Sequence, residues 1–286
     1  FTNLTQDHLD YHRNLSSYFY AKAKLFKGLS AKAFAVLNQD DKHYSLLKKI
    51  TRAEVITYGL GASAQVRAEK IIYGLKSTKF TLLFPGGRLR IEARLIGRHN
   101  IYNILAAFAW GLKEGLPLDK IKEAIENFSF APGRLEPVKC GMGFYIFVDY
   151  AHTEDALRNT LQSLRSLSLK RIITVFGCGG ERDTLKRPKM GKVASELSDF
   201  VIITNDNPRS ENPEGIIKDI TAGIKKDNYS VIYNRKEAIK SALTMSKKGD
   251  IVLVAGKGHE KYQILKNKVV RFDDREEIAR CLKSMN

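Results

Sequence analysis

Several features that would mark common protein classes are missing from this chain of 286 residues. No apolar run approaches the ~20 residues that cross a bilayer, and the first ten residues lack the basic and apolar regions of a signal peptide. The three cysteines, Cys140, Cys178 and Cys281, lie far apart with no C-x-x-C spacing. Neither a zinc site nor a disulfide framework is therefore indicated. These absences favour a cytoplasmic protein with no membrane insertion.

Two nucleotide-binding signatures are also absent. No G-x-x-x-x-G-K-[ST] occurs, so the chain has no P-loop of its own. The Gly-Cys-Gly-Gly turn at 177–180 lacks the G-x-G-x-x-G spacing, and Thr204 and Asn205 stand where a dinucleotide fold has an acid. A dinucleotide oxidoreductase is therefore disfavoured.

Acidic residues are few relative to basic ones. There are 48 Lys and Arg against 31 Asp and Glu, a net charge of +17, which attracts polyanions. The basic residues are spread along the chain without a block or an aromatic-interleaved stripe, and this disfavours a nucleic-acid partner. A non-catalytic polyanion-binding α/β protein stays open as an alternative, as does a general basic bias of the source proteome.

The predicted helices and strands form two different patterns, and the change from one to the other lies near Pro132. The earlier part predicts a loop and helix over 1–33, a strand at 34–37, a helix at 41–50, β-rich segments to about 96 and helices at 99–115 and 118–127. Within it, two alternating runs around Pro85-Gly86-Gly87 predict a hairpin. The later part predicts strands at 144–148, 171–176, 200–204, 230–233 and 251–254, separated by helices at 154–167, 188–197, 213–224 and 236–245. Such βαβ units predict a mainly parallel sheet with helices on both faces, followed by a hairpin at 262–272 and a helix from Arg275.

Polar, Gly-rich clusters follow four of these strands, at 149–153, 177–183, 205–209 and 255–260. Ligands of open α/β sheets bind beyond the carboxyl ends of the strands. Any one cluster could be an ordinary turn, because Gly, Asp and Asn are common in turns for backbone reasons. Four together favour a single pocket rich in donors and charge.

Six short motifs occur in the order found in Mur ligases, and the chain resembles that family over essentially its whole length. The motifs are T-N-L-T-Q-D-H-L-D-Y-H with Y-x-x-A-K (2–22), G-R-H-N-I-Y-N (97–103), G-R-L-E with D-Y-A-H-T (133–153), G-C-G-G-E-R-D with K-R-P (177–188), D-N-P-R (206–209) and G-K-G-H-E (256–260). The last two are similar to the MurE branch. There D-N-P-R marks enzymes that add meso-diaminopimelate, whereas lysine-adding relatives usually depart at the arginine.

The resemblance implies three domains, for the UDP-sugar, for ATP and for the incoming amino acid. It assigns residues 1–132 to the later part of a P-loop-type central ATPase domain and 133–286 to a Rossmann-like C-terminal domain with a mainly parallel sheet. The P-loop lysine, an upstream acidic magnesium ligand and the UDP-binding domain would be missing. Because the chain starts at Phe1 rather than Met and enters a motif at once, we expect a fragment that is inactive alone.

The family reaction makes an acyl phosphate from a substrate carboxylate and ATP, and an amine then attacks it. Such chemistry needs Mg²⁺ and positive groups more than a protein nucleophile. The resemblance implies His8 as a Mg²⁺ ligand and a carbamylated Lys22, because a carbamate gives the hard oxygen ligand that magnesium prefers. Judged by residue type alone, His8 would be a capping or buried histidine and Lys22 a solvated helix lysine.

For ATP, the resemblance implies Asn100 and Asn103 at the adenine, and Arg134 and Asp149 at the phosphates or ribose. An amide can pair with the donor and acceptor edge of adenine, although Asn100 could also be a residue of the helix N-cap region.

For meso-diaminopimelate, the implied residues lie in three of the polar clusters: Arg182, Asp206, Asn207, Arg209, Gly256 and Glu260. Arg209 can hold the distal carboxylate in a two-point fork that lysine cannot satisfy. Glu260 and the Gly256 carbonyl would accept from the distal ammonium. The alternative is that Arg209 pairs locally and Glu260 begins a surface strand.

The implied reaction adds meso-diaminopimelate to UDP-N-acetylmuramoyl-L-alanyl-D-glutamate at the expense of ATP, in a monomeric enzyme of peptidoglycan precursor synthesis. A lysine-adding MurE and another Mur-like ligase, such as a folylpolyglutamate synthase, remain alternatives.

Overall fold

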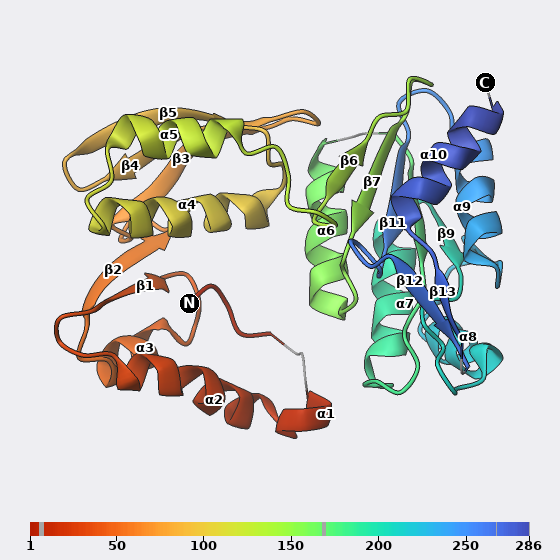
Figure 1. The fold of residues 1–286 in the computed structure, drawn as a ribbon, viewed down its shortest axis with the longest axis horizontal. Coiled ribbons are helices and arrows are strands. Elements are labelled where there is room, and N and C mark those ends of the chain that lie inside the picture. Colours follow the sequence, from red (N-terminus) through yellow and green to blue (C-terminus); the bar gives the residue numbers. More distant parts are fainter. Residues whose placement is uncertain (6–8, 168–169, 267, 286) are drawn as a thin grey trace. The chain divides into compact units, whose positions relative to one another are not determined.

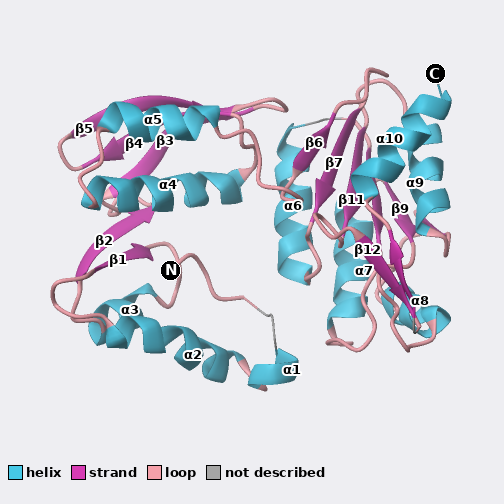
Figure 2. Cartoon of the chain, in the orientation of Figure 1, coloured by secondary structure: helices cyan, strands magenta, loops and turns pink. Residues whose placement is uncertain are grey.

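The computed structural model describes residues 1–5, 9–167, 170–266 and 268–285. The chain divides into two compact units, Phe1–Ser129 and Phe130–Asn286. Each unit is an α/β structure with its own sheet, as the ribbons show (Figures 1 and 2). The first sheet has five strands and the second has six.

The first unit combines a mixed sheet with helices. Its elements are α1 (Leu9–His12), α2 (Leu15–Gly28), β1 (Phe34–Asn38), α3 (Tyr44–Ile50), β2 (Glu54–Gly59), β3 (Val66–Tyr73), β4 (Thr78–Phe84), β5 (Gly87–Ala93), α4 (Arg98–Lys113) and α5 (Leu118–Asn127). β1, β2 and β3 are parallel, and β3, β4 and β5 form an antiparallel meander. The apolar stripe of α4, which includes Ile101, Leu105 and Phe108, packs in one core with Tyr58 and Leu82 of the sheet.

The second unit is built on a mainly parallel sheet. Its elements are β6 (Glu136–Val138), β7 (Tyr145–Asp149), α6 (Glu154–Leu167), β8 (Ile172–Phe176), α7 (Lys186–Leu197), β9 (Phe200–Ile203), α8 (Pro213–Thr221), β10 (Tyr229–Val231), α9 (Arg235–Thr244), β11 (Ile251–Ala255), β12 (Tyr262–Leu265), β13 (Lys268–Arg271) and α10 (Asp274–Met285). The strand order is β10-β9-β8-β11-β7-β6, and only β6 runs antiparallel to its neighbour. β12 and β13 form a separate hairpin.

Successive side chains of a strand point to opposite faces of the sheet, so the second unit has one layer of helices on each face. Residues such as Val148, Val175 and Val254 pack in one core with α9 and α10, while α6, α7 and α8 contact one another in a separate group. Three successive crossovers move the chain one way across the sheet and the fourth returns it to β11. Because crossovers are right-handed, this reversal places α9 on the face opposite α6, α7 and α8.

The five strands expected in the second unit are all present, and so are the helices between them. β6 was not predicted from the sequence, because it is three residues long and contains Pro137. A proline fits there since β6 lies at the edge of the sheet. The expected hairpin at 262–272 is confirmed, although Asn267 at its turn lies outside the described residues.

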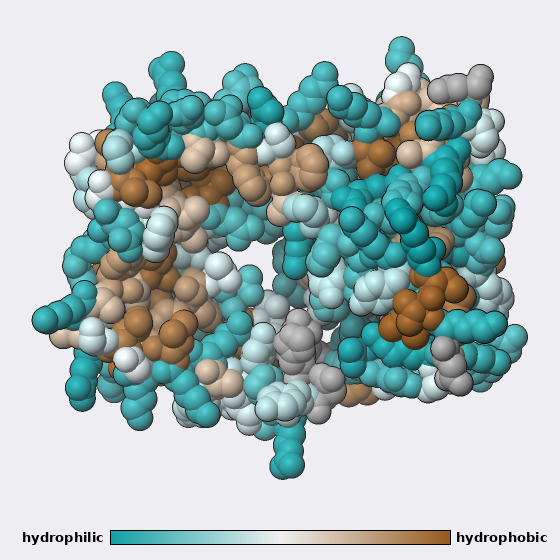
Figure 3. All heavy atoms as spheres, viewed as in Figure 1, coloured by the Kyte–Doolittle hydropathy of each residue, from teal (hydrophilic) through white to brown (hydrophobic). Residues whose placement is uncertain are grey.

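The face drawn in Figure 3 has both hydrophilic and hydrophobic areas, and one hydrophobic patch lies over the β12–β13 hairpin. Leu265, Val269 and Val270 are exposed there. Within the described residues, no helix is both long and apolar enough to span a membrane.

Candidate functional site

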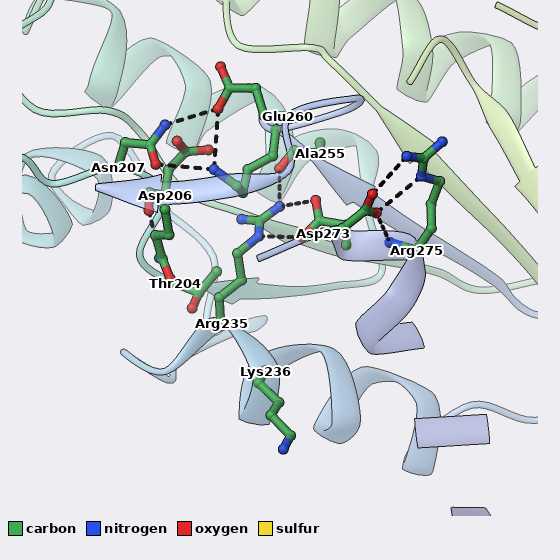
Figure 4. Close-up of polar contacts among 12 residues, drawn as sticks. Thr204, Asp206, Asn207, Arg235, Lys236, Ala255, Glu260, Asp273 and Arg275 are labelled. Atoms are coloured by element: carbon green, nitrogen blue, oxygen red, sulfur yellow. Dashed lines mark hydrogen bonds and ion pairs between the residues drawn. The ribbon is translucent and has the colours of Figure 1, made fainter. Parts of the chain in front are cut away.

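Four loops follow the carboxyl ends of β7, β8, β9 and β11, which are consecutive neighbours in the order β9-β8-β11-β7. Adjacent parallel strands end at the same edge, so the four polar clusters of the sequence come together there. Hydrogen bonds join residues of different clusters, so the loops form one structure (Figure 4).

At the centre of this edge, three side chains form a closed network. Asn207 donates from Nδ2 to Glu260 Oε2 at 2.9 Å. Lys257 donates from Nζ to Asn207 Oδ1 at 3.1 Å and to Glu260 Oε2 at 3.2 Å. The lysine side chain is fully buried, whereas that of Glu260 is 21% exposed. One Glu260 oxygen is thus held by two donors, and the carboxylate still reaches solvent.

Lys257 is a residue that the sequence patterns did not single out. It lies inside the Gly-Lys-Gly-His-Glu motif, in which only Gly256 and Glu260 were predicted to bind a ligand. A lysine between two glycines carries no periodic signal of burial, and lysine is almost never fully buried unless paired. Glu260 is three residues further along the chain, but only the fold brings Asn207 to this lysine.

The loop after β9 is held by β12. Asn207 Oδ1 accepts from the backbone N–H of Ile264 at 3.0 Å, and Gln263 Nε2 donates to the carbonyl of Asp206 at 2.6 Å. The backbone of Arg209 pairs with the same strand and with the residue after it: its N–H donates to the Ile264 carbonyl and its carbonyl accepts from the Lys266 N–H. Arg209 has a φ of 53°, a backbone conformation that bulky side chains rarely adopt.

The Arg209 guanidinium is half-buried, and its Nη1 donates to the carbonyl of Gly180 at 2.6 Å. Arg209 therefore makes a contact within the protein, which is the alternative to ligand binding that the sequence left open. The other side of the guanidinium fork has no hydrogen bond among those recorded for the described residues. Arg182 is exposed, and its Nη1 lies 3.4 Å from the Glu181 carbonyl.

Glycines let the loops after β8 and β9 approach closely. A Cβ on Gly177 would lie 2.1 Å from the Thr204 carbonyl oxygen, and one on Gly180 would lie 2.0 Å from that of Pro208. The Gly180 N–H donates to the Asn207 carbonyl at 2.9 Å. The Gly-Cys-Gly-Gly turn is therefore explained by contact with the Asp-Asn-Pro-Arg loop rather than by a dinucleotide.

Asp149 ends β7 and is 5% exposed. Its carboxylate accepts from the N–H of Leu135 at 2.6 Å and from that of Ala151 at 2.8 Å. Burial raises the pKa of this carboxyl, although the two N–H groups and the nearby Arg134 favour the charged form. The Arg134 guanidinium lies 5.0 Å from the centre of the Tyr150 ring. Asp149 thus orders the turn at 133–135 through its own oxygens.

The remaining expected site residues lie in the first unit. Asn100 is buried near the start of α4, where its Nδ2 donates to the Ile96 carbonyl at 2.8 Å and its Oδ1 accepts from Asn103 at 3.1 Å. Asn103 is the exposed member of the pair. Lys22 is half-buried on α2, with Nζ 4.9 Å from the Tyr18 ring centre. His8 lies outside the described residues.

Two family models match this chain. One, described as the Mur ligase middle domain, matches residues 1–111, and the other, described as the Mur ligase glutamate ligase domain, matches residues 133–258. The chain belongs to the Mur ligase family.

Several curated Mur ligases are similar to the chain. It is 45% identical to UDP-N-acetylmuramoyl-L-alanyl-D-glutamate--2,6-diaminopimelate ligase 1 of Clostridium acetobutylicum, over 100% of this chain and 59% of that protein. It is 46% identical to the ligase of the same reaction name from Solibacter usitatus, over 99% of this chain and 58% of the relative. The chain thus spans less than two thirds of the length of these relatives.

Solved Mur ligase structures share the fold. A UDP-N-acetylmuramoyl-L-alanyl-D-glutamate--2,6-diaminopimelate ligase superposes with a TM-score of 0.67 at 36% identity, over 99% of this chain and 59% of that one. MurF of Acinetobacter baumannii gives a TM-score of 0.77 at 17% identity, over 99% of this chain and 58% of that one. The latter likeness concerns the fold alone.

Mur ligases use a magnesium nucleotide, and a magnesium site needs groups that fit the metal. Among residues 1–5, 9–167, 170–266 and 268–285, no cluster of three His, Cys, Asp or Glu could hold a metal ion. Lys22 as an ammonium does not fit a cation site, since magnesium takes oxygen ligands. Lys22 would fit such a site only as the carbamate that the family resemblance implies.

Proposed function

We propose that this chain is part of an ATP-dependent ligase that adds meso-diaminopimelate to UDP-N-acetylmuramoyl-L-alanyl-D-glutamate, in the cytoplasm and as a monomer. The observation that carries the proposal is the joining of Arg209 and Glu260 at one edge of the sheet, through Asn207, Lys257 and β12. The names of the 42–46% identical relatives support the same reaction.

The charges at this edge suit an amino acid with an ammonium and a carboxylate at its far end. Glu260, Asp206 and the Gly256 carbonyl provide acceptors for an ammonium. Arg209 and Arg182 provide donors for a carboxylate, and an arginine can hold one through two parallel hydrogen bonds. L-Lysine has the distal ammonium but no distal carboxylate, so it would leave the free side of the Arg209 fork without a partner.

In the same proposal, residues 133–286 bind the incoming amino acid and residues 1–132 form part of the ATP-binding domain. Asn103 presents its amide for adenine, while Asn100 orients it. Arg134 contributes positive charge for the phosphates near the turn that Asp149 orders. Magnesium, when bound by His8 and a carbamylated Lys22, would neutralise charge on the phosphoryl group during transfer.

The test uses the protein expressed from the longest reading frame that contains this chain. Phosphate release is followed with ATP, Mg²⁺ and UDP-N-acetylmuramoyl-L-alanyl-D-glutamate, with meso-diaminopimelate or L-lysine added in turn. We expect turnover with diaminopimelate alone. Turnover with lysine instead would keep the ligase and overturn the role given to Arg209.

Substitution of Arg209 tests the specificity directly. Arg209→Ala should raise KM for diaminopimelate at least ~10-fold, which corresponds to about 1.4 kcal/mol, and leave KM for ATP nearly unchanged. Arg88→Ala, at an exposed position of β5, is the matched arginine control. An equal loss for both substrates would contradict the proposed contact.

The net charge of +17 favours a second candidate function, that of a non-catalytic polyanion-binding protein. Salt-dependent retention on DNA without any nucleotide turnover would favour it.

A further inference from the structure

A buried ion pair lies beside the β11 end of the amino-acid site (Figure 4). Arg235, the first residue of α9, donates from Nε to Asp274 Oδ1 at 2.7 Å and from Nη2 to Asp274 Oδ2 at 2.8 Å. Asp274 is the first residue of α10. Both side chains are 0% exposed. The pair therefore joins the starts of two helices on the same face of the sheet.

Arg235 makes one more contact, to the backbone of the site. Its Nη2 donates to the carbonyl of Ala255 at 2.9 Å. The next N–H along the chain, that of Gly256, donates to the carbonyl of Asp149 at 3.0 Å. This carbonyl and this N–H belong to one peptide unit, and a peptide unit is planar. Holding both ends therefore sets the orientation of the whole unit.

The orientation of this peptide fixes the start of the loop that carries Lys257 and Glu260. Gly256 has a φ of 107°, and a Cβ there would lie 2.8 Å from Asp206 Oδ2. Only glycine adopts such a backbone without strain. The Gly256 carbonyl is one of the acceptors proposed for the distal ammonium. A rotation of the Ala255–Gly256 peptide would displace these groups together.

Arg235 also interacts electrostatically with two carboxylates of the site, those of Asp206 and Glu260. Burial lowers the pKa of the guanidinium, but the charge and hydrogen bonds of Asp274 together with the carboxylates of Asp206 and Glu260 raise it overall. Nη1 of Arg235 is buried without a hydrogen-bond partner among the described residues. A buried ion pair contributes little net stability compared with apolar side chains of similar size, so stability alone is a weak reason for this arrangement.

We propose that Arg235 and Asp274 are a positioning pair that holds the Ala255–Gly256 peptide in the orientation needed to bind the incoming amino acid. The inference rests on the proposed function. Asp274 acts only through Arg235, and Arg235 acts through the peptide carbonyl rather than on the substrate. Loss of the pair should therefore weaken binding of diaminopimelate and spare the other substrates.

The decisive variant replaces the pair by apolar residues, Arg235→Met with Asp274→Leu. This double change leaves net charge unaltered and avoids a lone buried charge, so the fold should be kept. The matched control is Arg171→Met with Asp250→Leu, a pair whose Nη2–Oδ2 distance is 2.6 Å. Asp250 precedes the first residue of β11, so the control lies at the other end of the same strand.

We expect KM for diaminopimelate to rise at least ~10-fold in the test variant, while KM for ATP and for the UDP-linked substrate changes less than threefold. The control should leave all three values near those of the unaltered enzyme. An unchanged KM for diaminopimelate in the folded test variant would overturn the proposal. An equal rise for all three substrates, or the same rise in the control, would also overturn it.

If the double variant fails to fold, the Arg235→Lys variant tests the positioning role instead. A lysine can pair with Asp274 but lacks the planar fork that reaches Asp274 and Ala255 together. A selective rise in KM for diaminopimelate would support the positioning role, and an unchanged value would refute it. Failure of the proposed function is distinguishable, because the unaltered enzyme would then show no turnover with diaminopimelate.

Discussion

Lys257→Met removes the buried ammonium beneath the site and keeps a side chain of similar length. The ammonium makes two hydrogen bonds, at 3.1 Å to Asn207 and 3.2 Å to Glu260. Asn207 Oδ1 keeps the N–H of Ile264 as a donor, so this oxygen loses only one of its two hydrogen bonds. Glu260 keeps the Asn207 amide and some access to water. The damage is thus confined mainly to one charged hydrogen bond.

A hydrogen bond to a charged group contributes about 1.5–3 kcal/mol. Because Glu260 can be partly rehydrated, we expect the lower part of this range, about 2 kcal/mol, as the loss in free energy of unfolding. For a unit of this size that corresponds to a decrease in Tm of about 4–8 °C. Since Lys257 also holds Glu260 in place, KM for diaminopimelate should increase as well.

The assay is thermal unfolding followed by circular dichroism, with urea unfolding to give the free energy. The matched control is Lys261→Met, four residues along the chain, where the lysine is exposed. The control should lie within about 0.5 kcal/mol of the unaltered protein. If the two variants have the same stability, the ammonium of Lys257 is not part of the loop structure and the reasoning fails.

Two further predictions concern Gly180 and Asp149. Gly180→Ala should lower the free energy of unfolding by about 1–3 kcal/mol and weaken diaminopimelate binding, because its Cβ would meet the Pro208 carbonyl oxygen at 2.0 Å. The control is Gly215→Ala, which has nothing within 4 Å of its Cβ and should be neutral or stabilising. Urea unfolding of both variants checks this prediction. Burial raises the pKa of Asp149 above its usual value of 3.8, so its contribution to stability is fully present below that value and is lost as the pH rises through the raised pKa. The Tm of the unaltered protein should therefore fall relative to that of Asp149→Asn as the pH rises above 3.8. A difference in Tm that stays constant as the pH rises would contradict the raised pKa.

Local sequence patterns were sufficient to place most helices and strands. The continuous apolar runs at β7, β8, β9 and β11 are typical of parallel strands buried on both faces, and the sequence confines polar residues to the loops after these strands. Because parallel strands end at a common edge, the existence of one polar site could be predicted from the sequence alone. Neither the short edge strand β6 nor the pairing of Arg209 with β12 had a comparable local signal.

The buried cations of the second unit depend on partners that lie far away in the sequence. Lys257 and Asn207 are fifty residues apart in the sequence, and Arg235 and Asp274 are thirty-nine apart. No periodicity records which lysine or arginine will lose its water, since burial of a charge depends on the partner that the fold brings to it. The sequence therefore determined where a site could form and which residue types could serve it. The tertiary structure decided which cations became buried and left the Glu260 carboxylate partly exposed.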